Sequence, residues 1–206
     1  MAERTEPTVV SFDTESLVLV DDVDRVVGYA TKKACHEGQG ILHRAFSLFV
    51  LDGEGRVLLQ QRAMSKLLWP GYWSNSCCSH PRRGESMAEA TQRRLEEELG
   101  LRCPMQYLYK FMYRAGFESA GAEHELCWVY AGRTAAAVRP NGNEIASWRW
   151  IEPEALDREL AQEPERFTPW LKMEWRRLRA DYASLFTRVG DSGAAASAAP
   201  PELLEG

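Results

Sequence analysis

One stretch of the sequence, SMAEATQRRLEEELG, specifies both its own beginning and its own end. Ser86 and Glu89 have the S-x-x-E spacing of a capping box, in which each residue satisfies a free backbone N–H group of the first helical turn. Leu95 and Leu99 share one face of a helix, and Gly100 suits its C-terminal cap. We therefore predict a helix here, and its many charged residues raise the question of what they serve.

The rest of the sequence predicts mainly strands. SLVLVDDVDRVVGYA and AFSLFVLDGEGRVLLQQR each place a turn between two apolar runs, which predicts two hairpins. LYKFMYRA, HELCWVYAGR and SWRWI are further strand-like stretches. Two late helices are predicted to begin at Pro153 and, after the cap residue Thr168, at Pro169. These elements predict a mixed α/β (α+β) domain.

Length and composition predict one domain. Of the 206 residues, 16–189 form the expected domain, 1–15 a flexible N-terminus, and the Gly-, Ala- and Pro-rich 190–206 a disordered tail. The net charge of -5 argues against general attraction to nucleic acid or to an anionic membrane. Because no signal peptide or membrane-spanning run is evident, we expect a cytoplasmic protein whose five cysteines are not a disulfide framework.

The predicted helix lies in a stretch, SHPRRGESMAEATQRRLEEELGL, that resembles a Nudix box, a motif whose glutamates hold magnesium against a diphosphate. The residues at the motif's spacings are Glu85, Arg93, Glu97, Glu98, Gly100 and Leu101. Two positions depart from the motif, because Ser79 replaces its first glycine and Arg94 replaces a glutamate. Considered alone, the charge run also fits a solvated helix face, since Arg94 and Glu98 form an i,i+4 pair.

Several motifs in the same order as in the type 1 isopentenyl diphosphate isomerases extend this resemblance over residues 18–177. They are KKACHEGQGILHRAFS, RAMSK, WPGYWSNSCCSH, ESMAEATQRRLEEELG, YRA, EHELC and FTPW. The resemblance implies a Nudix-like fold of mixed β-sheets flanked by helices. It also implies an isomerase of isoprenoid biosynthesis that interconverts isopentenyl and dimethylallyl diphosphate.

The resemblance further implies a divalent metal site. The matching residues are His36, His43, His80, Glu123 and Glu125. Residues two apart point to the same side of a strand, so the two glutamates would share one face and His124 would point away. This mixture of nitrogen and oxygen ligands accepts Mg, Mn or Zn.

A diphosphate carries about three negative charges, so an acidic protein must gather basic groups and metal to hold it. For this role the resemblance nominates Lys32, Arg62, Lys66 and Arg94, and it nominates Glu98 as the ligand of a second, substrate-associated Mg. At Arg94 a phosphate-binding cation would stand where the motif has a metal-binding anion. That exchange suits an enzyme that retains the diphosphate. We expect neither flavin nor nicotinamide as a cofactor.

Moving a double bond by proton addition and removal, through a tertiary carbocation, requires an acid and a base on opposite faces of the olefin. The resemblance assigns these roles to Cys78 and Glu125, with Tyr113 hydrogen-bonded to the glutamate and Trp170 facing the cation. If WSNSCCSH is extended, Cys78 points to the same side as His80, the predicted metal ligand two residues later. Cys77 would then point away and serve packing.

Two other functions are compatible with parts of the sequence. A Nudix hydrolase of a nucleoside diphosphate derivative would use the glutamates of the box, but Arg94 opposes it and Cys78 would have no use. A non-catalytic module could use the histidines and glutamates to clamp a structural metal. We expect a small-molecule diphosphate as partner, and a chain that is a monomer or a weak homodimer.

Overall fold

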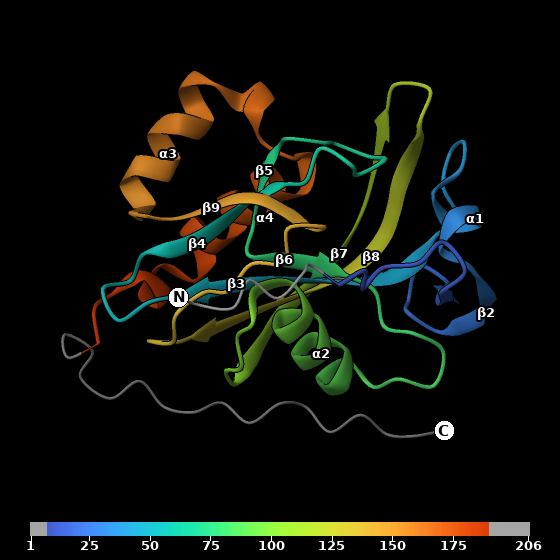
Figure 1. The fold of residues 1–206 in the computed structure, drawn as a ribbon, viewed down its shortest axis with the longest axis horizontal. Coiled ribbons are helices and arrows are strands. Elements are labelled where there is room, and N and C mark those ends of the chain that lie inside the picture. Colours follow the sequence, from blue (N-terminus) through green and yellow to red (C-terminus); the bar gives the residue numbers. More distant parts are fainter. Residues whose placement is uncertain (1–7, 190–206) are drawn as a thin grey trace.

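The computed structural model describes residues 8–189, in which a mixed β-sheet lies between helices (Figure 1). Its strands are β1 Ser16–Val20, β2 Val26–Thr31, β3 His43–Leu51, β4 Val57–Arg62, β5 Trp73–Ser74, β6 Cys77–Ser79, β7 Met105–Phe117, β8 Gly121–Arg133 and β9 Ile145–Ile151. Its helices are α1 Lys32–His36, α2 Met87–Leu99, α3 Pro153–Gln162 and α4 Pro169–Asp181, with short 3-10 turns at Pro164–Arg166 and Ala183–Phe186. The predicted mixed α/β class is confirmed.

Strand β3 is buried on both faces and divides the core into two layers. Phe46, Leu48 and Val50 belong to the apolar cluster that also contains the buried side chains of α2. Phe49 and Leu51 point to the opposite side and pack with buried side chains of α3 and α4. This alternation follows from the two-residue period of a strand, and it explains why the sequence of β3 is almost continuously apolar.

Strands β3 and β8 form a parallel pair that fixes the geometry of the centre. Their register runs from the pair His43 and Glu125 to the pair Leu51 and Arg133. On its other side β8 pairs with β7 in a long antiparallel hairpin, seen as the tall ribbon pair in Figure 1. Because His43 lies directly opposite Glu125, the pairing alone brings two of the predicted metal ligands together.

The predicted hairpins have different outcomes. The first is confirmed, because β1 and β2 pair antiparallel along their whole length. In the second, the turn at 52–55 forms, but β3 and β4 pair only between Leu51 and Val57. The two strands diverge because β3 pairs with β8 and β6, whereas β4 takes β9 and β5 as its neighbours.

Helix α2 confirms the strongest local prediction. Ser86 and Glu89 make both hydrogen bonds of the capping box, and Gly100 ends the helix with a φ of 62°. However, Arg94 and Glu98 are buried instead of solvated, which excludes the solvated-face interpretation for this pair. The two proline-initiated helices also begin where predicted, at Pro153 and Pro169.

The connection between α1 and the β7–β8 hairpin depends on a glycine. Gly121 has a φ of 145°, and a Cβ atom built on it would lie 2.2 Å from the carbonyl oxygen of His36. Only a residue without a side chain allows this approach. The end of α1, which carries a predicted metal ligand, therefore sits directly against the start of β8.

Parts of the predicted domain organisation lie outside the described residues, namely 1–7 of the N-terminus and the tail 190–206. Residues 8–15 contain no helix or strand, but the carbonyl of Val10 accepts a hydrogen bond from Arg94. The single domain over 16–189 stays a prediction. No helix among residues 8–189 has the length and apolar character needed to span a membrane.

Candidate active site

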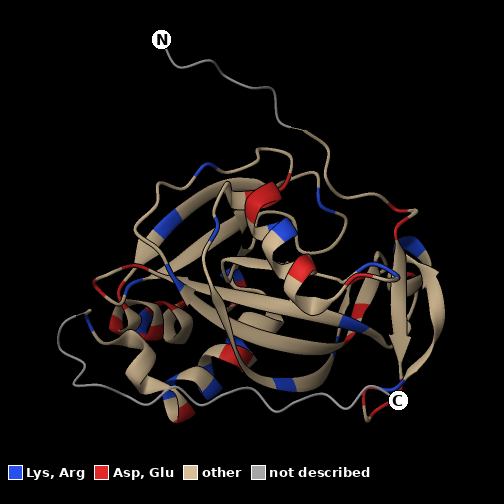
Figure 2. Cartoon of the chain, turned by 90° about the horizontal axis from the view of Figure 1, so that it is seen from below, with Lys and Arg blue, Asp and Glu red and all other residues tan. Residues whose placement is uncertain are grey.

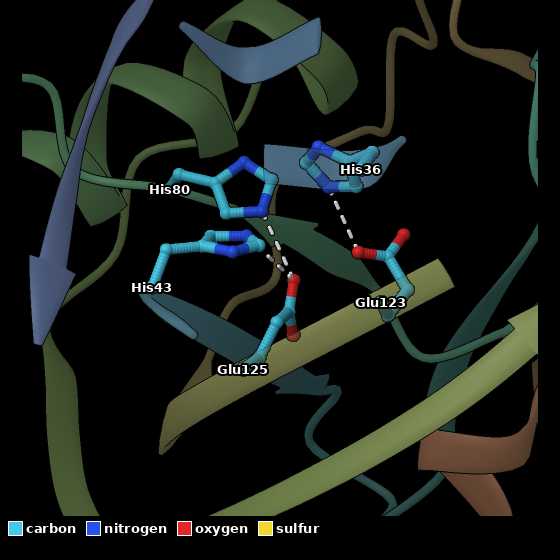
Figure 3. A group of neighbouring side chains, drawn as sticks. All are labelled: His36, His43, His80, Glu123 and Glu125. Carbon is cyan, nitrogen blue, oxygen red and sulfur yellow. Dashed lines mark hydrogen bonds and ion pairs between the residues drawn. The ribbon is translucent and has the colours of Figure 1, made fainter. Parts of the chain in front are cut away.

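Three histidines and two glutamates from distant parts of the sequence meet in the buried centre (Figure 3). One ligand atom from each of His36, His43, His80, Glu123 and Glu125 lies within 4.8 Å of the others. They come from the end of α1, the start of β3, the residue after β6, and alternate positions on one face of β8. The predicted cluster therefore forms in space.

The orientation of the imidazole rings suits a metal ion. Nδ1 of His36 donates to the carbonyl of Lys32, and Nδ1 of His43 donates to that of Ile41, each at 2.7 Å. These bonds fix the tautomer that leaves an Nε2 lone pair toward the cluster. Nε2 of His43 is buried with no hydrogen-bond partner, and Oε2 of Glu123 lies 2.8 Å from Nε2 of His36 without hydrogen-bond geometry. Both observations fit ligands directed at a shared cation.

Electrostatics in the cluster favour the same interpretation. Burial lowers the pKa of His43 to about 4 and holds that of His80 well below its ordinary value, so both rings are neutral. Burial, together with Glu123, raises the pKa of Glu125. Burial disfavours the charged form of His36, but Glu123 outweighs burial and raises the pKa of this third ring. A bound cation would take the place of a proton between His36 and Glu123 and would relieve the repulsion between the two glutamates. The cluster is therefore suited to a divalent metal.

Cys78 lies on the same side of β6 as the metal cluster. Its Sγ donates to Oδ1 of Asn75 at 2.8 Å and lies 3.4 Å from Oγ of Ser47. Burial raises the pKa of this thiol well above its ordinary value, which keeps it protonated. Cys77 points the other way and packs fully buried in the α2 layer, as the alternation predicts.

Glu125 and Trp170 are both held by hydrogen bonds. The hydroxyl of Tyr113 donates to Oε2 of Glu125 at 2.7 Å, as expected from the sequence. The indole Nε1 of Trp170 donates to Oγ of Ser74 at 3.0 Å and to Oδ1 of Asn75 at 3.2 Å. Asn75 thus contacts both the thiol and the indole. Asn75 lies within the WSNSCCSH motif, but nothing in that motif had indicated a role for it.

A cavity of about 700 Å³ joins these groups. Its wall includes the site residues Cys78, Tyr113, Glu125, Trp170, His36, His80, Glu123, Lys32, Arg62, Lys66 and Arg94. Metal-binding, proton-carrying and basic groups therefore face one space. Glu98 and His43 do not belong to the lining of this cavity.

Arg62 is fixed by the loop that follows β4. Its guanidinium donates to the backbone carbonyls of Leu68 and Trp69 and lies 5.5 Å from the ring centre of Trp170. Trp69 has a φ of 47°, which is uncommon for a residue with a side chain. The loop therefore holds the arginine against the aromatic wall of the cavity.

The remaining basic residues are paired with acidic ones. Lys66 forms an ion pair with Glu144, and Nη2 of Arg94 contacts both Glu98 and Glu144. Nζ of Lys32 lies 3.9 Å from a Glu15 carboxylate oxygen. Glu144 was missed by the sequence analysis. It follows a turn-forming NGN segment, but nothing in that pattern indicates that its carboxylate enters a cavity.

Comparison with known proteins identifies the fold and then the family. The NUDIX domain family matches residues 41–171, so fold and site define a NUDIX-domain protein. A solved structure from Deinococcus radiodurans has a TM-score of 0.66 and 26% identity over 79% of this chain and 98% of that one. A MutT protein from Methanosarcina mazei, at 17% identity and a TM-score of 0.54 over 68% of this chain and 94% of its own, shares the fold.

Curated relatives narrow the family. An isopentenyl-diphosphate Delta-isomerase of Burkholderia multivorans is 46% identical over 156 residues, which is 76% of this chain and 88% of that protein. One from Serratia proteamaculans is 41% identical over 178 residues, which is 86% of this chain and 99% of that protein. The chain belongs to the isopentenyl-diphosphate Delta-isomerase family within the NUDIX domain proteins.

Behind Cys78 lies a buried carboxyl group that the sequence analysis also missed. Glu174 of α4 is 1% exposed, its Oε2 has no hydrogen-bond partner, and its Oε1 is 3.8 Å from Sγ of Cys127. Burial raises the pKa of Glu174 to about 8 from an ordinary value of 4.5. The folded protein therefore keeps a proton on this group that the unfolded chain releases at neutral pH.

This shift predicts a pH-dependent loss of stability. Because the folded-state pKa of Glu174 is the higher one, its contribution is fully present below pH 4.5 and is lost as the pH rises through 8. Glu174→Gln keeps the shape without the titration, so its melting temperature should fall less than that of the wild type between pH 5 and pH 8. Thermal unfolding at four pH values measures this. Parallel curves for the two proteins would contradict the assignment.

Proposed function

We propose that this chain interconverts isopentenyl diphosphate and dimethylallyl diphosphate in isoprenoid biosynthesis. Membership in the isomerase family supports the activity. The observation that carries the proposal is that a protonated thiol, Cys78, and a tyrosine-bound carboxyl, Glu125, line one cavity together with basic side chains. These are the groups required for proton addition, proton removal and diphosphate binding.

At the anionic end, we assign Lys32, Arg62, Lys66 and Arg94 to the phosphate oxygens. All four line the cavity, and charge-assisted hydrogen bonds to phosphate are strong where water is scarce. Glu98 is assigned as the ligand of a second Mg that arrives with the substrate diphosphate. Glu98 forms an ion pair with Arg94, which lines the cavity, but it does not line the cavity itself.

At the other end, His36, His43, His80, Glu123 and Glu125 would hold Mg, Mn or Zn. When bound, the cation would orient the Glu125 carboxyl group and tune its basicity. The hydrogen bond from Tyr113 fixes the other oxygen of that group at 2.7 Å. Glu125 is thus positioned from two sides for proton transfer.

The chemistry divides between Cys78 and Glu125. One group gives a proton to the terminal carbon of the alkene. The π electrons of the double bond form the new C–H bond, which leaves a tertiary cation on the neighbouring carbon. The other removes a proton from the adjacent methylene, and the electrons of that C–H bond become the new double bond. Since the reaction is reversible, each group acts as the acid in one direction and as the base in the other.

The surroundings protect the cation. Trp170 is 2% exposed and lines the cavity, so its ring can face the positive charge while its N–H stays bonded to Ser74. Exclusion of water prevents capture of the cation as an alcohol. We infer no role for flavin or nicotinamide, because the proton additions and removals leave the oxidation level unchanged.

The alternative of a Nudix hydrolase is less favoured. Arg94 stands where the hydrolase motif has a glutamate, and it is buried against Glu98. Hydrolysis would also leave the Cys78 environment without a use. We further propose a cytoplasmic enzyme that acts as a monomer or a weak homodimer on this small diphosphate, without nucleic acid or membrane as partners.

The activity has a direct test in heavy water. Protein purified with Mg should convert isopentenyl diphosphate to dimethylallyl diphosphate, because both proton carriers line the cavity. Deuterium from the solvent should appear in the new methyl group, since the added proton comes from an exchangeable residue. NMR detects both results. Unchanged substrate with no deuterium, or release of phosphate, would rule the isomerase out.

The adjacent cysteines should differ sharply. Cys78→Ala should abolish turnover and keep the fold and bound metal, because it removes a proton carrier from the cavity wall. Cys77→Ala should keep turnover nearly intact and lower the free energy of unfolding by about 1 kcal/mol, because its sulfur is buried in the α2 layer. Turnover and thermal unfolding of both variants check this. Equal loss of turnover in the two would mean that the wrong cysteine was assigned.

A further inference from the structure

Glu144 places a negative charge at the anion-binding end of the cavity. Its backbone is fixed on both sides, because its N–H donates to the carbonyl of Asn141 and its own carbonyl accepts from the N–H of Ala63, each at 2.9 Å. The residue is only 4% exposed, yet it belongs to the cavity wall. A buried carboxylate inside a site for a diphosphate requires a physical explanation.

The carboxylate is ionised and holds two of the basic residues. Oε2 of Glu144 forms an ion pair with Lys66 and lies 3.4 Å from Nη2 of Arg94. Burial alone would raise the pKa of Glu144, but Lys66 and Arg94 outweigh this effect and lower it. The charge on Glu144 is therefore present at neutral pH, directed at the same side chains that a phosphate group would contact.

Two of the other basic residues of the cavity also have carboxylate partners, whereas Arg62 is held by the backbone carbonyls of Leu68 and Trp69. Arg94 contacts Glu98, and Lys32 lies near Glu15. Figure 2 shows Lys and Arg positions scattered among Asp and Glu positions along the described ribbon. Three of the four phosphate-binding candidates, Lys32, Lys66 and Arg94, already have carboxylate partners, which reduces the positive charge that the pocket offers to an anion. A bare diphosphate then gains less net attraction there than four unpaired cations would give it.

Glu144 differs from the other carboxylates in its position. Glu98 pairs with Arg94 but does not line the cavity, and Glu15 lies outside its wall as well. Among the described residues at the basic end, Glu144 is the carboxylate that both lines the space and pairs with two phosphate-binding candidates. An incoming anion must therefore compete with Glu144 for Lys66 and Arg94.

We propose that Glu144 makes diphosphate binding in this cavity depend on a divalent cation. A diphosphate without a cation is repelled by the fixed carboxylate of Glu144, which also holds Lys66 in an ion pair. A diphosphate that carries a divalent cation brings a positive charge that compensates Glu144. The residue thereby selects the metal complex over the free anion. This inference rests on the proposed function, which supplies the diphosphate substrate.

The test measures binding without turnover. Inorganic pyrophosphate is titrated by calorimetry into metal-depleted protein and into protein with excess Mg. For the wild type, Mg should strengthen binding by at least about thirtyfold. Glu144→Gln should bind metal-free pyrophosphate about tenfold more tightly than the wild type, because Lys66 and Arg94 lose a competing anion. Both proteins keep the same His–Glu cluster, so the difference between them reports on Glu144.

A matched control separates this effect from net charge. Glu159 of α3 pairs with Arg149 of β9 and does not line the cavity. Glu159→Gln removes one carboxylate there and should bind pyrophosphate as the wild type does. If Glu144→Gln does not tighten metal-free binding, or if Glu159→Gln tightens it equally, the proposal is overturned.

Two further measurements keep the outcome decisive. If Glu144→Gln fails to fold, Glu144→Asp keeps the charge and should retain the wild-type dependence on Mg; tight metal-free binding by Glu144→Asp would overturn the proposal. Failure of the isomerase is distinguishable. Protein that shows the expected pyrophosphate binding but does not convert isopentenyl diphosphate supports Glu144 and rejects the proposed function.

Discussion

The burial of three imidazoles and two carboxylates at one point is the constraint on which the rest of the structure depends. Two crowded carboxylates in a dry interior are unfavourable unless a cation compensates them. The parallel pairing of β3 and β8 sets His43 opposite Glu125, and the approach of α1 to Gly121 adds His36. Because these contacts come from different elements, a cation bound here would also stabilise the fold.

The same cluster positions the groups assigned to proton transfer. His80 follows β6, so Cys78 lies two residues away on the same side of the strand. Glu125 belongs both to the cluster and to the cavity wall, where Tyr113 fixes its second oxygen. With the proposed roles, a NUDIX scaffold would support isomerisation in place of hydrolysis through two particular residues, the thiol of Cys78 in β6 and the guanidinium of Arg94 in α2. Fold alone does not decide the reaction.

The sequence predicted local features best. The ends of α2 followed from its caps, and the opposite directions of Cys77 and Cys78 followed from the strand period. The parallel pairing of β3 with β8 could not be predicted, because those strands are far apart in the sequence and periodicity does not specify partners. Glu144 and Glu174 were missed for a related reason, since burial of a carboxylate depends on what packs around it.

The central claim is that the five residues of the cluster hold one divalent cation. Anomalous diffraction from crystals grown with Mn tests it most directly. The account predicts one strong peak enclosed by Nε2 of His36, His43 and His80 and by carboxylate oxygens of Glu123 and Glu125. A structure with no peak among these atoms, or with histidine rings turned so that Nε2 faces away, would contradict it.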